Sequence, residues 1–300
     1  MENILDWGIE VILWCQQFSP ALDSLFKAFT FLGNEYFFLV FLSIIYWCTN
    51  RKVGIRLIFM FLLTGYVGAM AKEIANQPRP HQYTERVTPL IEIDGFGFPS
   101  LHTLTAVTMW GYLASQFRRT WLWILAGVLM VCIPLSRVYL GVHFPTDLLG
   151  GYILGGVLLL SYLKIEPGLE KWLTENPVLQ WIMPFGLPIL LLLIILLASR
   201  DESSTIAAAM LMGAMVGFTI ERRWVRFESG GIWWKQVLRF LLGIIGLFVV
   251  RAGLKRIFPE GDQVFRAIRY GCIGLWLGVG GPLAFVKLRL AEVRPARAES

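Results

Sequence analysis

The sequence predicts an all-α protein, a polytopic transmembrane helical bundle of about nine spans with interfacial helices at its N-terminus. Two observations predict this fold. Hydrophobic residues make up 56% of the 300 residues and charged residues only 16%, a balance that is typical of polytopic membrane proteins. Apolar segments also recur along the chain, and several approach the roughly 20 residues that a helix needs to cross a bilayer.

The first 30 residues are predicted to form interfacial helices. They carry the acidic residues Glu2, Asp6 and Glu10, and they lack the positively charged start, apolar core and cleavage site of a signal peptide. Apolar residues recur there at helical spacing, which favours an amphipathic helix lying in the headgroup region. These apolar residues are Ile4, Leu5, Ile9, Ile12 and Leu13.

Nine apolar segments are predicted to span the membrane, and the first of them is short. They are residues 36–48, 54–71, 101–117, 120–135, 144–163, 178–198, 205–220, 232–250 and 266–286.

A polar stretch, residues 166–176, contains Pro167 and Gly168 and is predicted to be a linker. It separates a core of residues 31–165 from a C-terminal bundle of four spans, residues 177–290. Residues 291–300 are predicted to be a disordered tail.

The net charge of +6 is interpreted as evidence about membrane topology, and no nucleic-acid partner is expected. If the spans alternate, the side that holds residues 51–56, 118–119 and 222–226 receives more of the basic residues and is predicted to be cytoplasmic. A basic cluster from Arg251 to Arg269 lies on the opposite side and works against this bias. Solvation and pairing with headgroups explain that cluster, so it is left out of the predicted site.

Alternation of the spans also brings the chemically useful polar residues of the core to one side of the membrane. The chain leaves the bilayer after residues 54–71, re-enters near residue 101, leaves again near residue 135 and re-enters near residue 144. The predicted pocket is formed by Lys72, Arg79, Ser100, His102, Ser136, Arg137, His143 and Asp147.

These residues describe an anion site. Ser100 is placed as the N-cap of the helix that begins at Leu101, and Pro145 suits the first position of the next inward helix. The N-termini of helices present free N–H groups and partial positive charge, and Lys72, Arg79 and Arg137 add full charges. A tetrahedral oxyanion such as phosphate fits this set best.

Two histidines and a carboxylate supply the chemistry. Asp147 follows His143 by four residues, so its carboxylate can reach one ring nitrogen across a helical turn and fix the tautomer. The other nitrogen keeps its lone pair and can attack phosphorus. His102, at the start of the neighbouring helix, can protonate the leaving oxygen and later deprotonate water.

The residues carry a resemblance to a known family. The first motif is Lys72, six residues and then Arg79-Pro80, and the second is Pro99-Ser100-Leu101-His102. The third is Ser136-Arg137, five residues, His143, three residues and Asp147. Together they resemble the three-part signature of the type 2 phosphatidic acid phosphatase superfamily. The resemblance covers residues 31–163, just under half of the chain.

The resemblance implies a role for each residue of the signature. It implies that His143 becomes phosphorylated, that His102 is the acid and that Asp147 orients the nucleophile. It also implies that Lys72, Arg79, Ser100 and Arg137 hold phosphate oxygens without a metal or other cofactor. Ser136 occupies a motif position, with a structural role.

One residue departs from the family pattern. The second motif commonly has Gly where this chain has Leu101, and a larger residue there is similar to sphingosine-1-phosphate phosphatases. The triplet Gly33-Asn34-Glu35 and the additional C-terminal spans point the same way, whereas bacterial undecaprenyl pyrophosphate phosphatases share the broader signature.

The sequence therefore predicts a metal-independent lipid phosphate phosphatase, a multi-pass protein of the lipid bilayer whose site lies on the extracytoplasmic (periplasmic or lumenal) face. The substrate can be a phosphomonoester or a diphosphate of a membrane lipid. The sequence also leaves open whether the protein forms a homo-oligomer. A lipid phosphotransferase with the same phosphohistidine is an alternative. A lipid transporter or flippase is another, although no inverted repeat is apparent and the charged groups gather at one face.

Overall fold

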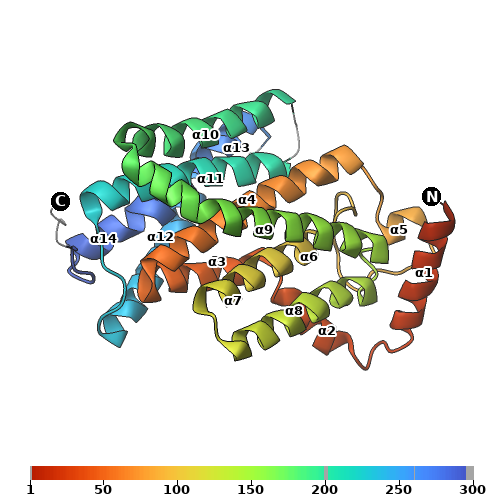
Figure 1. Cartoon of the computed structure of the whole chain (residues 1–300). Coiled ribbons are helices and arrows are strands. Elements are labelled where there is room, and N and C mark those ends of the chain that lie inside the picture. Colours follow the sequence, from red (N-terminus) through yellow and green to blue (C-terminus); the bar gives the residue numbers. More distant parts are fainter. Residues whose placement is uncertain (1, 199–201, 260, 295–300) are drawn as a thin grey trace. The chain divides into compact units, whose positions relative to one another are not determined.

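The computed structural model describes residues 2–198, 202–259 and 261–294. These residues form α-helices and short π-helical turns, with one isolated β-bridge between Phe227 and Val293, so the predicted all-α class is confirmed for them. The helices, shown in Figure 1, are α1 (Glu2–Gln16), α2 (Asp23–Phe31), α3 (Glu35–Ile44), α4 (Arg51–Ala75), α5 (Pro80–Tyr83), α6 (Leu101–Thr105), α7 (Gly111–Phe117), α8 (Thr120–Tyr139), α9 (Pro145–Glu175), α10 (Pro177–Ala198), α11 (Glu202–Ile220), α12 (Trp233–Ile257), α13 (Gln263–Leu275) and α14 (Gly281–Lys287). The π-helical turns are η1 (Ile45–Thr49), η2 (Ala106–Trp110), η3 (Glu221–Val225) and η4 (Trp276–Gly280).

Six helical segments of the described chain are long and apolar enough to cross a membrane, or up to seven if the bent pair α2 and α3 is one span. The expected count of nine is therefore not confirmed. Predicted segments 101–117 and 178–198 are not among the six. The first of these is helical throughout, as α6, η2 and α7, but it is shorter than the roughly 20 residues that a crossing helix needs. In η2 the Thr108 hydroxyl donates to the carbonyl of Leu104 at 3.0 Å. Such back-bonding from a threonine hydroxyl is a known cause of local helix distortion.

The chain clusters into two compact units. The first unit consists of Met1–Phe38 and Thr64–Gly168, and the second of Leu39–Leu63 and Leu169–Ser300. The domain boundaries expected from the sequence stay a prediction. Residues 166–175 of the predicted linker continue α9 as a helix, with Pro167 inside it. The predicted disordered tail lies outside the described residues from residue 295 onward.

Glycines allow α9 to pack closely on α6 in the first unit. A Cβ at Gly151 would lie 2.8 Å from the carbonyl oxygen of Ser100, and one at Gly155 would lie 3.2 Å from that of Leu104. These contacts support the packing role that small residues have between membrane helices. Gly156 has nothing within 4 Å of such a Cβ. The close approach positions the starts of α6 and α9 next to each other.

The N-terminal helix α1 packs on the first unit through one face. Ile9 and Ile12 are buried in a cluster that includes Phe144. The Tyr83 hydroxyl donates to Asp6 Oδ1 at 3.1 Å, which joins α1 to α5, and Figure 1 shows these two helices side by side. The amphipathic pattern of residues 1–30 therefore serves at least partly to cover this unit.

The second unit is built around close contact between α11 and α13, which lie side by side with α10 in Figure 1. A Cβ at Gly213 of α11 would overlap the carbonyl of Gly271, and one at Gly274 would lie 2.7 Å from the backbone nitrogen of Ala214. Backbone contact of this kind needs glycine on both helices.

A buried ion pair also stabilises the second unit. Arg51, at the start of α4, donates from Nε to Glu221 Oε2 at 2.7 Å, and its Nη2 contacts the same oxygen. The two side chains are 8% and 0% exposed. The backbone N–H of Phe227 donates to the other carboxylate oxygen at 3.0 Å, so both carboxylate oxygens accept hydrogen bonds.

We expect Arg51→Met to lower the melting temperature of the detergent-solubilised protein by several degrees. Removal of one partner leaves a buried charge without its counter-ion, which costs about 3–5 kcal/mol. The double variant Arg51→Met/Glu221→Met should recover part of this loss, and Lys52→Met, which removes an exposed neighbouring charge, should have little effect. Equal melting temperatures for Arg51→Met and Lys52→Met would contradict a stabilising pair.

Candidate active site

All seven predicted catalytic and phosphate-binding residues lie in the first unit. They come from the end of α4, the segment after it, the starts of α6 and α9, the end of α8 and the turn between α8 and α9. That turn needs a glycine, because Gly141 has a φ of +72° and its position faces the side chain of Gln16. The turn presents His143 directly before α9.

His143 and Asp147 form the contact that their spacing predicts. His143 Nδ1 and Asp147 Oδ2 are 3.0 Å apart, and the side chains are 2% and 0% exposed. Asp147 Oδ2 also accepts from the backbone N–H of Phe144 at 3.0 Å, and Oδ1 accepts from Gln77 Nε2 at 2.9 Å. The buried carboxylate therefore has donors on both oxygens, which holds its orientation fixed.

The partners of the His143 ring assign its tautomer. A carboxylate beside Nδ1 requires that nitrogen to donate, and Arg79 Nη1, which is always a donor, lies 3.3 Å from Nε2. Nε2 therefore carries the lone pair that a nucleophilic imidazole needs, and in this structure it faces the Arg79 guanidinium.

Burial lowers the pKa of His143 well below the usual histidine value, and the positive charges of Arg137, Lys72 and Arg79 lower this pKa further. The imidazole is therefore neutral near pH 7, and its lone pair is available without prior loss of a proton.

Arg79 uses most of its donors on backbone carbonyls. Its Nε and Nη2 donate to the carbonyl of Asp94 at 3.3 and 3.0 Å, Nε also donates to Gly95, and Nη1 donates to Val142 at 3.0 Å. Arg79 therefore fixes the loop at residues 94–95 and the turn beside His143. Lys72 holds the next part of that loop, because its Nζ donates to the carbonyl of Phe96 at 2.6 Å.

Arg137 differs from Arg79 in having open donors. Its side chain is 1% exposed, and Nη1 contacts the Thr30 hydroxyl. Its Nε and Nη2 are buried and have no hydrogen-bond partner. A buried guanidinium with unused donors is costly unless an anion completes it, which is compatible with the predicted phosphate-binding role of Arg137.

Ser100 and His102 begin α6 as the sequence predicts. The Ser100 hydroxyl accepts from the N–H of Thr103 at 3.4 Å, a capping contact, and the Ser100 N–H donates to the carbonyl of Asp147 at 2.9 Å. Gly33 leaves room for the His102 ring, because a Cβ there would lie 2.9 Å from His102 Cδ2. His102 is thus held beside the segment that joins α2 and α3.

Two motif positions, Ser136 and Leu101, make local contacts that account for the residue type at each position. The Ser136 hydroxyl donates to the carbonyl of Ile133 at 2.6 Å, which supports a structural role. Leu101 packs against Gly68 of α4, where a Cβ would lie 2.6 Å from Leu101 Cδ1. The glycine on α4 therefore makes space for the side chain at the position where the family pattern commonly has Gly.

Sequence reasoning missed two residues that contact the site. Gln77 lies between Lys72 and Arg79 in the chain, so its position was a usable signal. Thr30 lies 107 residues from Arg137, and nothing in the sequence connects them. In the described part of the chain, no group of three or more His, Cys, Asp or Glu residues could hold a metal ion. The expectation of metal independence stays a prediction.

Comparison with known proteins identifies two family matches. Residues 53–170 match the model of the PAP2 superfamily, and residues 205–293 match the model described as PAP2 superfamily phosphatase, transmembrane extension. The first match contains every predicted catalytic and phosphate-binding residue.

Several individual proteins are similar to the chain. Sphingosine-1-phosphate phosphatase 2 of Mus musculus is 31% identical over 150 residues, which is 46% of this chain and 41% of the mouse protein. Phosphatidylglycerophosphatase B of Bacillus subtilis (strain 168) is 32% identical over 158 residues, which is 48% of this chain and 74% of that protein. The crystal structure of a transmembrane PAP2-type phosphatidylglycerolphosphate phosphatase from Bacillus subtilis is 24% identical, with a TM-score of 0.49 over 56% of this chain and 88% of its own. The chain thus spans less than half the length of the mouse relative.

The two most deeply buried arginines should respond oppositely to replacement by methionine. Arg239 of the second unit is also 1% exposed, but it donates to the carbonyls of Trp47 at 3.0 Å and Glu228 at 3.1 Å and contacts that of Gly230. Arg239→Met leaves these carbonyls without donors, at about 1–3 kcal/mol each, and should lower the melting temperature in detergent. Arg137→Met removes an incompletely paired charge and should leave the melting temperature unchanged or raise it. A loss for Arg137→Met as large as that for Arg239→Met would show that Arg137 has a structural role.

Proposed function

The chain belongs to the PAP2 superfamily, and from this membership and the geometry of the site we propose that it is a multi-pass membrane phosphatase that hydrolyses the phosphate ester of a lipid. One observation carries the proposal. His143 has Asp147 on one ring nitrogen and a lone pair beside Arg79 on the other, and the positive charges of Arg137, Lys72 and Arg79 lower the pKa of the ring.

The first half of the reaction transfers phosphate to the protein. Arg137 binds phosphate oxygens with its open Nε and Nη2 donors, and Lys72 and Arg79 add positive charge. Nε2 of His143 attacks phosphorus, a P–N bond forms, and the bond from phosphorus to the lipid oxygen breaks. Asp147 accepts from Nδ1 and stabilises the charge that the ring gains. Fixed positive charge of this kind stabilises the transition state of phosphoryl transfer.

His102 moves the protons in both halves. It gives a proton to the departing lipid oxygen, and it then takes one from the water that attacks the phosphohistidine. The P–N bond breaks, inorganic phosphate leaves, and both histidines return to their starting forms. The proposal needs no metal, because the three cations supply the charge.

The substrate that we propose is a membrane lipid phosphate that enters from the bilayer, on the extracytoplasmic face. Leu101 with its partner Gly68, the matched C-terminal extension and the similarity to a sphingosine-1-phosphate phosphatase favour sphingosine-1-phosphate among the candidates. A diphosphate such as undecaprenyl pyrophosphate is the competing substrate within the same chemistry.

We expect the detergent-purified protein to release phosphate in EDTA from at least one lipid in a panel of sphingosine-1-phosphate, phosphatidic acid and undecaprenyl pyrophosphate. His143→Ala should reduce this release by roughly 10³-fold or more, because the nucleophile is lost. The wild-type protein should also retain acid-labile label after brief incubation with ³²P-labelled substrate. His81→Ala is the matched control, since it removes a histidine outside the proposed mechanism.

Two outcomes would contradict this prediction. Release that stops in EDTA, or that is equal in His143→Ala, would exclude the mechanism. A phosphorylated second lipid in place of free phosphate would assign the same intermediate to a phosphotransferase.

The role of His102 can be separated from that of His143 by the leaving group. We expect His102→Ala to reduce turnover of the lipid phosphate by about 10²–10⁴-fold, because an alkoxide leaves poorly without a proton. With p-nitrophenyl phosphate, the phenolate leaves without a proton, so the rate of the first half-reaction should fall far less in His102→Ala. A burst measurement isolates the rate of this first half-reaction. An equal burst-phase loss with both substrates would show that His102 acts in another way.

A further inference from the structure

A second positively charged pocket lies in the other unit, apart from the residues of the candidate active site. It encloses about 210 Å³ and is formed by the start of α11, the end of α12 and α13. Its residues, except Glu202 at the start of α11, fall within residues 205–293, the match to the transmembrane extension. Neither the signature motifs nor the proposed mechanism uses this region.

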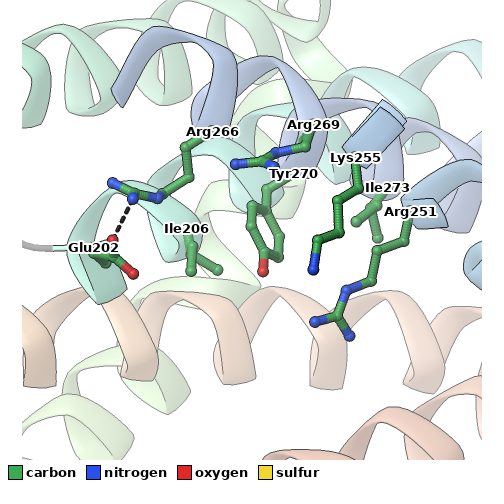
Figure 2. Close-up of a pocket in the computed structure, with 8 residues that line it drawn as sticks. All are labelled: Glu202, Ile206, Arg251, Lys255, Arg266, Arg269, Tyr270 and Ile273. Carbon is green, nitrogen blue, oxygen red and sulfur yellow. Dashed lines mark hydrogen bonds and ion pairs between the residues drawn. The ribbon is translucent and has the colours of Figure 1, made fainter. Parts of the chain in front are cut away.

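The pocket concentrates charge. Four basic side chains line it together with the single carboxylate of Glu202, which contacts Arg266. Figure 2 shows this ion pair at one end of the pocket, Arg251 and Lys255 at the other, and the Arg269 guanidinium between them. Basic side chains therefore outnumber carboxylates among the lining residues, and they lie beside the hydroxyl of Tyr270.

Helix-end effects and solvation account for only part of this cluster. Lys255 lies in the last turn of α12, where the helix dipole favours a cation. Arg266 lies in the first turn of α13, where the dipole disfavours one, and Asp262 already caps that helix through the N–H groups of Val264 and Phe265. The ion pair with Glu202 offsets this placement of Arg266, and a bound anion would add to it.

Arg269 gives an independent indication of a ligand. Its side chain is 8% exposed, so solvation is largely lost. Its Nε is buried and has no hydrogen-bond partner. A guanidinium in this state binds a tetrahedral oxyanion well, because its planar donors match two oxygens at once.

We propose that this pocket binds a phosphate group, separately from the catalytic site. Its volume is below the roughly 300–1,000 Å³ of pockets that enclose a whole drug-sized ligand, so it fits a headgroup and not a lipid tail. Ile206 and Ile273 give the cavity an apolar wall against which the first carbons of a lipid can pack. The phosphate could belong to an anionic lipid or to a soluble compound, and the chemistry of recognition is the same.

Binding would tie three helix ends together through one anion. The occupant would neutralise repulsion between the end of α12 and the start of α13, and it would therefore stabilise the second unit. This gives the matched extension a ligand-binding role in addition to helix packing, one that holds whether or not the proposed hydrolysis is correct.

The test compares pocket variants in a His143→Ala chain, which removes hydrolysis by the proposed mechanism. Native mass spectrometry counts bound dioctanoyl phosphatidic acid, with dioctanoylglycerol as the matched lipid that lacks phosphate and inorganic phosphate as the soluble arm. Arg251→Gln/Lys255→Gln should weaken one class of phosphatidic acid site by roughly 10- to 30-fold, since two cations near the phosphate are lost. Arg269→Gln should weaken the same site.

Lys287→Gln is the charge-matched control for Arg269→Gln, because Lys287 is exposed at the end of α14 and does not line the pocket. Binding at the candidate active site is common to all these chains, so the difference between them reports the pocket alone. Pocket-dependent binding of phosphatidic acid but not inorganic phosphate would identify a lipid headgroup as the occupant, and binding of both would admit a soluble phosphate. Equal binding by all variants, or equal binding of dioctanoylglycerol, would overturn the proposal. Arg269→Gln decides the outcome if the double variant does not fold.

Discussion

The carboxylate of Asp147 is completely buried, and the candidate site is organised around the need to satisfy it. Its three donors come from His143, from the backbone of Phe144 and from Gln77. The carbonyl of the same residue accepts from the N–H of Ser100, which joins the start of α9 to the start of α6. One residue thus connects the segment after α4, the turn before α9 and the helix that carries the candidate acid.

The buried arginines Arg79, Arg239 and Arg137 differ in how many of their donors are used in hydrogen bonds. Arg239 and Arg79 use their donors mainly on backbone carbonyls and act as ties between segments. Arg137 leaves two nitrogens unused at the same depth of burial. Positive charge is therefore structural at Arg239 and Arg79, and its proposed chemical use is at Arg137; a count of arginines in the sequence could not separate the two.

The features that the sequence predicted well are local ones. The four-residue spacing of His143 and Asp147 and the capping position of Ser100 each depend on a single helical turn, and both contacts are present. The features it did not predict join distant segments, as in the contact of Thr30 with Arg137.

Span prediction was limited for a different reason, which is length. Residues 101–117 are helical throughout, as α6, η2 and α7, but they are fewer than the roughly 20 residues that a crossing helix needs. The π-helical turn does not end the helix, because η4 lies inside the candidate span Gln263–Lys287. The hydroxyl of Thr108 in η2 also accepts from Thr64 of α4 at 3.1 Å, a contact between helices that hydropathy does not register.

The contact between Leu101 and Gly68 has a consequence for how such sites diverge. A Cβ at position 68 of α4 would lie against the Leu101 side chain, so the two side chains share one space. A larger residue at position 68 alone would clash with Leu101, and a smaller residue at position 101 alone would leave a void. Related chains should therefore cross between a small and a large residue before the motif histidine through paired substitutions. The identity of the residue at position 68, on a helix that carries only one of the motif residues, would then record which form of the second motif a sequence carries.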